Sequence, residues 1–205
     1  VMEDHIKSLA DLFAEFPGIG ERQSKRFVYY LLSRDSSYLS HLSKLIIELP
    51  RHTTRCIECY RFFEKTNTNT ICTICSNSKR DTTQLMIVEK DADLSAIERS
   101  KTYKGKYFVF GGLVPVVEKE TPRWIRINEL TQHIKKAKGA ITEIILAFSL
   151  HPQGEHTDTY IREQLSTLAE EQKFHLVSLG RGLSTGTELE YSDADTLESA
   201  LKNRQ

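Results

Sequence analysis

The protein has 205 residues, of which 39% are hydrophobic and 27% charged, so the chain can bury a core and is not wholly disordered. Its 28 Lys and Arg residues balance 28 Asp and Glu residues, so bulk positive charge cannot drive binding to a nucleic acid. No run of about 18 apolar residues is present, and the acidic N-terminus lacks the apolar centre of a signal peptide. We therefore expect a cytoplasmic protein with no membrane partner.

The first 50 residues predict three amphipathic helices. The first covers residues 6–16, the second begins near Glu21, and the third covers residues 38–49. In the third helix the apolar side chains expected to face inward are Leu39, Leu42, Leu45 and Ile46.

The sequence Pro17-Gly18-Ile19-Gly20 between the first two helices is typical of a helix-hairpin-helix. Glycines permit a positive φ and leave backbone N–H groups bare beside the positive end of the second helix, which makes a cradle for phosphate. Three cations follow on the first turns of that helix. The candidate DNA-binding residues are Gly18, Gly20, Arg22, Lys25 and Arg26. The alternative is an ordinary tight connection with a solvated basic face. Contacts of this kind hold the DNA backbone and do not read sequence.

The four cysteines form two Cys-x-x-Cys pairs, Cys56 with Cys59 and Cys72 with Cys75, separated by a short polar stretch. This spacing lets four thiolates surround one ion at roughly 2.3 Å, so it predicts one structural Zn²⁺ per chain in a small zinc finger. Four sulfur ligands leave no position for a substrate or a water molecule. The alternative, a pair of disulfides or reactive thiols, requires an oxidising compartment.

Strand and helix patterns alternate in the second half of the chain. Strands are predicted at residues 84–89, 107–110, 143–147 and 174–179, and helices at 91–100, 128–138 and 157–171. Such alternation predicts a parallel or mostly parallel sheet with helices on both faces, and a site at the carboxyl ends of the strands. Glu89 and residues 149–155 fall at that edge. Asp91 and Asp93 are interpreted as a helix cap.

A Glu that closes the first strand (Glu89) and a Gly-Glu pair after a later strand (Gly154-Glu155) resemble the Toprim fold of topoisomerases, primases and some nucleases. In catalytic Toprim proteins the later strand leads into an Asp-x-Asp pair that binds Mg²⁺. Those two positions here are Ser149 and His151, and neither is the oxygen anion that Mg²⁺ prefers. The resemblance therefore implies that the metal-dependent chemistry has been lost. The rival hypotheses are a Toprim-type nuclease or topoisomerase-like enzyme, and a zinc-ribbon adaptor that binds only protein.

The order of these parts resembles the bacterial RecR family of recombination mediators over nearly the whole chain. The matching strings are the turn at residues 16–20 with Arg22 and Arg26, the two cysteine pairs, Val88-Glu89, Gly111-Gly112, Gly154-Glu155-x-Thr157, and Gly182-Leu183 through Glu188-Leu189-Glu190-Tyr191. The expected fold is a multidomain α/β protein with a helix-hairpin-helix domain (1–54), a zinc finger (55–80), a Toprim domain (81–179) and a short helical C-terminal tail (180–205).

The chain departs from the family pattern at several positions. Phe16 replaces the usual Leu, Phe108 replaces a His, and Ser184 replaces a Pro. Residues 116–120 replace a Gly-containing turn, and residues 151–154 are shortened by about a residue or two. These departures indicate a divergent member.

The resemblance implies a non-enzymatic DNA-repair factor in the bacterial cytoplasm, associated with the nucleoid. Such a factor acts with a RecO-type partner, and a RecF-type partner in addition, to load the RecA recombinase on gapped DNA or DNA coated with single-strand binding protein. It also implies a homo-oligomer, a tetrameric ring or a dimer. Glu89 and Glu155 are expected to bind the RecO-type partner, or else to have only local roles such as holding a helix start. No Gly-x-x-x-x-Gly-Lys loop is present, so ATP hydrolysis is not expected.

Overall fold

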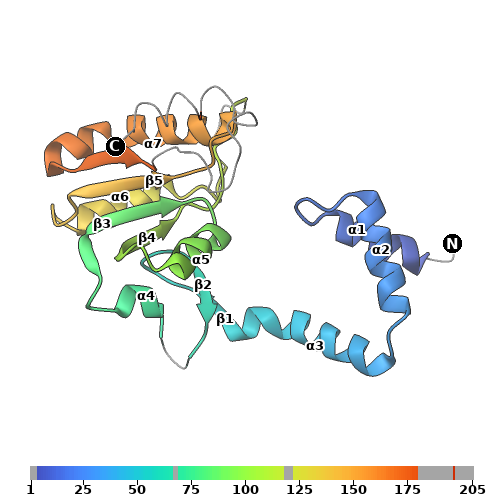
Figure 1. Cartoon of the computed structure of the whole chain (residues 1–205). Helices are drawn as coiled ribbons and strands as arrows, with labels where there is room; N and C mark the ends of the chain where they lie inside the picture. The colour runs from blue at the N-terminus through green and yellow to red at the C-terminus, as the bar shows by residue number, and fades with distance from the viewer. Residues whose placement is uncertain (1–3, 67–68, 118–121, 180–195, 197–205) are drawn as a thin grey trace. The chain divides into compact units, whose positions relative to one another are not determined.

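The computed structural model describes residues 4–66, 69–117, 122–179 and 196. The chain forms two compact units, unit 1 ending at Thr53 and unit 2 beginning at Thr54 (Figure 1). Apart from residue 196, the predicted C-terminal tail, with Ser184, lies outside the described residues, and the division into four domains stays a prediction. Across the described ranges, no helix is both long and apolar enough to cross a bilayer.

Unit 1 consists of three helices, α1 (His5–Ala14), α2 (Glu21–Leu32) and α3 (Ser36–His52). The Asp4 side chain caps α1, and the Asp35 side chain caps α3 by accepting a hydrogen bond from the Tyr38 N–H at 2.8 Å. Small residues let α1 and α2 approach closely. The side chains buried in these two helices are Ala10, Ser24 and Val28.

The helix α3 has no buried residue, although its apolar periodicity is clear. The prediction that its apolar face points inward is wrong within one chain: Leu39, Leu45 and Ile46 are exposed, and Leu42 is half-buried. Periodicity reveals an apolar face but not the surface that covers it. The helix also runs three residues beyond the predicted end, through Pro50 to His52.

Unit 2 begins with the cysteine segment. The short strands β1 (Thr53–Arg55) and β2 (Phe62–Glu64) pair with each other, and the short helix α4 (Thr73–Ser76) carries the second cysteine pair.

The remainder of unit 2 is a sheet with three helices. Its elements are β3 (Asp81–Val88), α5 (Asp91–Ser100), β4 (Gly105–Val109), α6 (Ile127–Lys136), β5 (Glu143–Ala147), α7 (Pro152–Gln172) and β6 (His175–Ser178). The strand order is β4-β3-β5-β6, and every pair is parallel, which confirms the predicted sheet. The central position of β3 explains its fully apolar run, because a central parallel strand is covered on both faces.

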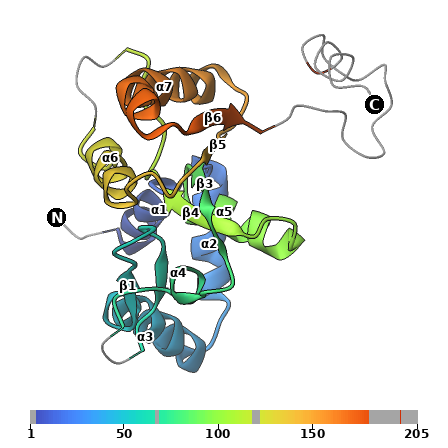
Figure 2. The same ribbon diagram turned by 90° about the vertical axis from the view of Figure 1, so that its left-hand side faces the viewer.

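Successive residues of β3 face two different cores. Leu85 and Ile87 lie in a cluster with side chains of α6 and α7, whereas Met86 and Val88 lie in a cluster with α5 and the cysteines. Figure 2 shows α5 on the other side of the sheet from α6. Helices therefore cover both faces, as the sequence predicted.

Candidate functional site

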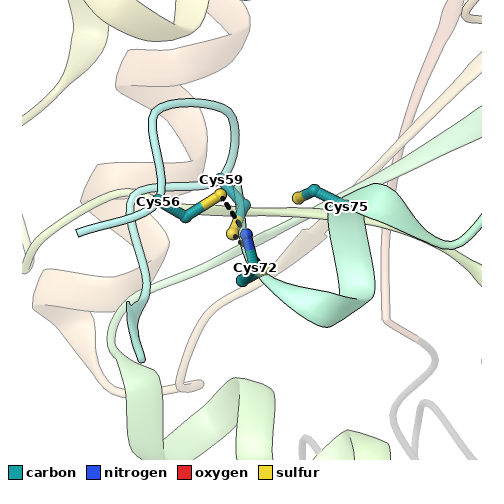
Figure 3. A group of neighbouring side chains, drawn as sticks. All are labelled: Cys56, Cys59, Cys72 and Cys75. Atoms are coloured by element: carbon teal, nitrogen blue, oxygen red, sulfur yellow. Dashed lines mark hydrogen bonds between the residues drawn. The ribbon is translucent and has the colours of Figure 1, made fainter. Parts of the chain in front are cut away.

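The four cysteines come together in one cluster. Their sulfur atoms all lie within 4.8 Å of one another; three of the cysteines are buried and Cys75 is half-buried (Figure 3). Tetrahedral ligands at roughly 2.3 Å from an ion stand about 3.8 Å apart, and the sulfurs of Cys59 and Cys72 are 3.6 Å apart. All four are free thiols and not disulfides. The group is positioned to bind a metal ion.

The backbone around the first cysteine pair is folded to present its sulfurs. Tyr60 adopts a positive φ of 62°, and the Cys56 N–H donates to the Arg61 carbonyl at 2.9 Å, which closes the turn. The Cys72 N–H donates to the Cys56 sulfur at 3.4 Å. Such a donor stabilises a thiolate, which is the form that binds metal.

The hydrogen bonds among the four thiols shift the pKa values of Cys56 and Cys59 in opposite directions. A hydrogen bond from Cys59 lowers the pKa of Cys56, and the same hydrogen bond raises the pKa of Cys59. A cation bound by all four sulfurs replaces these protons, so binding releases protons and weakens in acid.

The cysteine cluster shares its core with the sheet. The same apolar cluster holds three cysteines together with Met86, Val88, Leu94 and Tyr107. From β4, the Lys106 ammonium donates to the carbonyls of Ile74, Cys75 and Asn77 at 3.2, 2.8 and 3.0 Å. Lys106 therefore fixes the end of α4 and the last cysteine. Its role was not predictable, because its partners lie about thirty positions earlier in the chain.

A second set of polar contacts joins the residues just before β3 to α5 and β4. The Arg80 guanidinium pairs with Glu98 of α5 and donates to the Gly105 carbonyl at 2.8 Å. Burial alone would raise the pKa of Glu98, but the hydrogen bond from Arg80 and its positive charge hold that pKa below its ordinary value. The carboxylate of Glu98 therefore stays charged in the folded protein.

Phe108, one of the departures from the family pattern, is fully buried between the cysteine segment and α6. Its ring centroid lies 5.2 Å from that of Tyr60 and 5.8 Å from that of His133. Burial lowers the pKa of His133, whose Nδ1 is 3.5 Å from a Glu58 oxygen. An aromatic ring at position 108 fills this space without a polar group that needs a partner.

In unit 1, the turn between α1 and α2 is open around its two glycines. Gly18 has φ of +76°, and a side chain on Gly18 or Gly20 would meet no described atom within 4 Å. Gly20 is the N-cap of α2 and supplies no side chain, so no cap side chain accepts from the first N–H groups of the helix. Phe16 supports the turn, with its ring 5.8 Å from Phe13.

The three predicted cations are not equivalent. Arg22 and Arg26 are exposed, one helical turn apart, and have no ion pair within 4 Å among the described residues. Lys25 pairs with Glu21 at 2.7 Å, and the hydrogen bond to Glu21 raises the pKa of Lys25. The charge of Lys25 is thus partly neutralised, in contrast to the charges of Arg22 and Arg26.

At the sheet edge, the helix α7 begins at Pro152, five residues before its predicted start. His151 caps the helix, its Nδ1 accepting from the Gly154 N–H at 3.4 Å, and Pro152 occupies the first turn. A Cβ on Gly154 would lie 1.9 Å from the Ser149 carbonyl oxygen, so only glycine fits. Gly154 and Glu155 consequently belong to the helix and not to the loop before it.

The two predicted partner-binding carboxylates line neighbouring hollows. Glu89, directly after β3, lines a hollow of about 440 Å³ with Asp93, Ser149 and His151. Glu155 lines a hollow of about 350 Å³ that also includes Ser149. Both carboxylates thus lie at the carboxyl edge of the sheet, on either side of Ser149. Within the part of the chain that the structure describes, the cysteines are the only group arranged to hold a metal ion.

The Asp91 and Asp93 side chains have different roles in α5. Asp93 accepts a hydrogen bond from the Lys90 N–H at 3.1 Å, which confirms its predicted role in the cap. Asp91 instead accepts from the Phe62 N–H at 2.7 Å and ties α5 to β2 of the cysteine segment.

Comparison with known proteins agrees with this geometry. The Toprim domain family matches residues 83–176, so unit 2 is a Toprim sheet joined to a four-cysteine metal-binding group. The family "RecR, C-terminal" matches residues 182–205.

The chain is also similar along its length to curated relatives, each named "Recombination protein RecR". It is 33% identical over 201 residues to that of Legionella pneumophila (strain Corby), covering 98% of this chain and 97% of the relative. It is 32% identical over 203 residues to that of Nocardioides sp. (strain ATCC BAA-499 / JS614), covering 99% and 97%. It is 34% identical over 200 residues to that of Ruegeria pomeroyi, covering 98% and 96%. The chain belongs to the RecR family, as the sequence motifs predicted, and the relatives' names point to a role in recombination.

Proposed function

We propose that this protein is a recombinational DNA-repair mediator that binds DNA without sequence preference as an oligomeric clamp. With a RecO-type partner, and a RecF-type partner in addition, it helps to load RecA on gapped DNA or on DNA coated with single-strand binding protein. It works in the bacterial cytoplasm at the nucleoid. The observation that carries the proposal is the exposed α1–α2 turn, where open N–H groups stand beside Arg22 and Arg26.

A chain with no net charge needs several copies to hold DNA. The logarithm of affinity falls with the logarithm of salt concentration by about 0.9 for each phosphate contacted, so two arginines bind weakly on their own. A tetrameric ring around one duplex multiplies these contacts, and a dimer doubles them. Once one copy binds, the others act at high effective concentration.

The exposed apolar residues of unit 1 support this assembly. They are Ile6, Leu12, Phe16, Tyr29, Tyr30 and Leu32 on α1, the turn and α2, and Tyr38, Leu39, Leu45, Ile46, Ile47 and Leu49 on α3. Surfaces of this kind on soluble proteins mark interaction sites. We propose that unit 1 of another copy covers them.

We propose that the ion held by the four cysteines is Zn²⁺ in a structural role. Four thiolates with tetrahedral spacing suit zinc and leave no open coordination position. Among the described residues no other group would carry metal chemistry.

The protein, in this proposal, breaks no covalent bond. The positions where a catalytic Toprim protein has its carboxylate pair are Ser149 and His151, and His151 is used to cap α7. Among the described residues of the sheet edge, no group arranged to hold a metal ion favours the rival nuclease or topoisomerase-like activity. Glu89 and Glu155 instead offer an acidic surface for the RecO-type partner, and Glu155→Ala should weaken capture of that partner. Unchanged capture would leave Glu155 with only a local role in the first turn of α7.

The decisive experiment for DNA binding is charge reversal in the turn. The double variant Arg22→Glu and Arg26→Glu should lose retention of duplex DNA in low salt while its circular dichroism and its mass in solution stay unchanged. The control is Lys7→Glu at the far end of α1, which makes the same charge change as one of these two substitutions. Normal duplex binding by the double variant would overturn the proposed DNA contact.

A further inference from the structure

Unit 2 carries a group of aromatic rings and arginines, three of them exposed and two half-buried, that the proposed function does not use. We call it the aromatic–arginine patch, and it consists of Arg55, Tyr60, Phe62, Trp124 and Arg126. These residues come from β1, the first cysteine turn, β2 and the segment before α6. Phe62 is 51% exposed and Trp124 is 62% exposed, although both are large apolar side chains.

The guanidinium groups of the patch lie over aromatic rings. The guanidinium carbon of Arg55 is 4.8 Å from the centroid of the Phe62 ring, and that of Arg126 is 5.5 Å from the centroid of the Tyr60 ring. A guanidinium stacked in this way keeps its charge and presents its second face to a ligand. The patch therefore offers several flat surfaces and two positive charges together.

Arg126 is held in place by the backbone. Its Nη1 donates to the Val109 carbonyl at 2.8 Å. A Cβ on Gly111 would lie 2.3 Å from the Trp124 carbonyl oxygen and 2.9 Å from Arg126 Nη1, so this packing requires glycine there. The indole of Trp124 lies over Gly112, 3.5 Å from where a Cβ would stand. The patch is thus built on a fixed loop beside the end of β4.

No ion pair among the described residues neutralises the positive charges of the patch. Burial lowers the pKa of Arg126, and the nearby charge of Arg55 lowers it further, so the two cations face each other. Glu58, Asp91 and Glu129 also face the patch. Asp91 is occupied by the Phe62 N–H and Glu58 lies beside His133, and no described carboxylate is within 4 Å of either arginine's nitrogens.

We propose that the aromatic–arginine patch binds single-stranded nucleic acid, with unpaired bases stacked on Trp124 and Phe62 and phosphates near Arg55 and Arg126. Bases in a duplex are already stacked on each other, whereas unpaired bases stack on exposed rings and guanidinium planes. A peptide would use the rings but would leave two unpaired cations, which favours a polyanion. This site is independent of the α1–α2 turn, so a clamp on duplex DNA would also hold the strand of an adjoining gap.

The chain contains one tryptophan, and it lies in the patch, so its fluorescence reports this site alone. Titration of the full-length, metal-loaded protein with oligo(dT) in low salt should quench Trp124 fluorescence in a saturable way, and added salt should reverse the quenching. A duplex of equal length should quench much less.

Substitutions distinguish nucleic-acid binding by the aromatic–arginine patch from binding by the α1–α2 turn. The double variant Arg55→Gln and Phe62→Ala, with Trp124 kept as the reporter, should bind oligo(dT) about tenfold or more weakly, because it loses one cation and one stacking ring. The matched control, Arg99→Gln with Leu150→Ala, removes one exposed cation and one exposed apolar side chain elsewhere on unit 2 and should bind normally. The Arg22→Glu and Arg26→Glu variant should keep the Trp124 quenching even where it loses the duplex.

Three results would overturn the inference. The first is oligo(dT) binding that leaves Trp124 fluorescence unchanged and is lost only when Arg22 and Arg26 are reversed. The second is equal quenching by duplex and single strand. The third is a patch variant that binds oligo(dT) normally but fails to capture a purified RecO-type protein, since the patch would then be a protein-binding surface. If the protein failed to retain duplex DNA while oligo(dT) still quenched Trp124, the inference would stand. Such a result would bear only on the proposed function.

Discussion

In unit 2 apolar side chains fill both faces of a parallel sheet, and a four-cysteine group extends one of these cores. In unit 1 most large apolar side chains remain exposed, and the longest helix, α3, buries nothing. Both regions have amphipathic sequences. The difference lies in the surface that covers the apolar side chains: unit 2 supplies helices and the cysteine segment for its sheet, whereas no described residue of α3 is buried within the chain.

The largest expected effect on unit 2 comes from removal of its metal. Chelation, or Cys59→Ser, should remove most of the stability of the cysteine segment, because apparent binding energies for such sites in peptides are about 10–16 kcal/mol. The shared core means that the sheet should melt at lower temperature as well. Thermal unfolding followed by circular dichroism, with bound zinc measured in parallel, checks this. Ser76→Ala on α4 is the control, and equal stability of the Cys59 variant would show that the sulfurs hold no structural ion.

The next largest effect is expected from replacing an apolar side chain by Ala, which should cost much stability in unit 2 and little in unit 1. Ile144 in β5 is fully buried, so Ile144→Ala should cost about 2–5 kcal/mol of unfolding free energy. Ile46 in α3 is 60% exposed, so Ile46→Ala should cost little in the isolated chain. Denaturant unfolding at low protein concentration compares them. Similar losses for both variants would mean that α3 is already covered within one chain.

The Arg80–Glu98 pair gives a pH-dependent test in unit 2. The pKa of Glu98 in the folded protein lies below its ordinary value. The stability that Glu98 contributes is therefore complete above its pKa in the unfolded chain, and it is lost as the pH falls through its pKa in the folded protein. Glu98→Gln should therefore destabilise the protein at neutral pH, by about 1–3 kcal/mol. The two proteins should converge in stability in acid. A stability difference that persists at low pH would show that the charge on Glu98 contributes nothing.

The smallest effect on stability should accompany a large effect on assembly. Ile46→Asp places a charge on the exposed face of α3 and should leave the melting of unit 2 unchanged while the mass in solution falls toward that of one chain. Light scattering measures this mass. Lys44→Asp, a change of an exposed polar residue on the same helix, is the control. An unchanged mass for the Ile46 variant would show that other surfaces hold the copies together.

Local patterns in the sequence predicted much of unit 2. The strand β5 has the predicted bounds because an apolar run between polar turns is unambiguous there. The start of α7 was missed because Pro152 and Gly154 are typical of loops, and only the contact of Gly154 with the Ser149 carbonyl explains a glycine in the helix. The cysteine cluster was predicted from spacing alone. Lys106 and Arg80 were not, because their partners are distant in sequence and no local pattern marks them.

The inward face of α3 was the clearest error, and its cause is physical. Spacing of Leu45 and Ile46 predicts an apolar face, but the same spacing serves a core, a dimer or a ring. Similarly, the sequence grouped Lys25 with Arg22 and Arg26, and only the structure shows its ion pair with Glu21.

The central claim is that a neutral chain grips the DNA backbone through two arginines repeated in each copy of an assembly. Its most direct test is the salt dependence of binding to a duplex of random sequence. Arg22→Gln should roughly halve the slope of log affinity against log salt, because one of two phosphate contacts per copy is lost, and scrambling the DNA sequence should change nothing. A slope that stays the same in the variant, or an affinity that follows the base sequence, would contradict the claim.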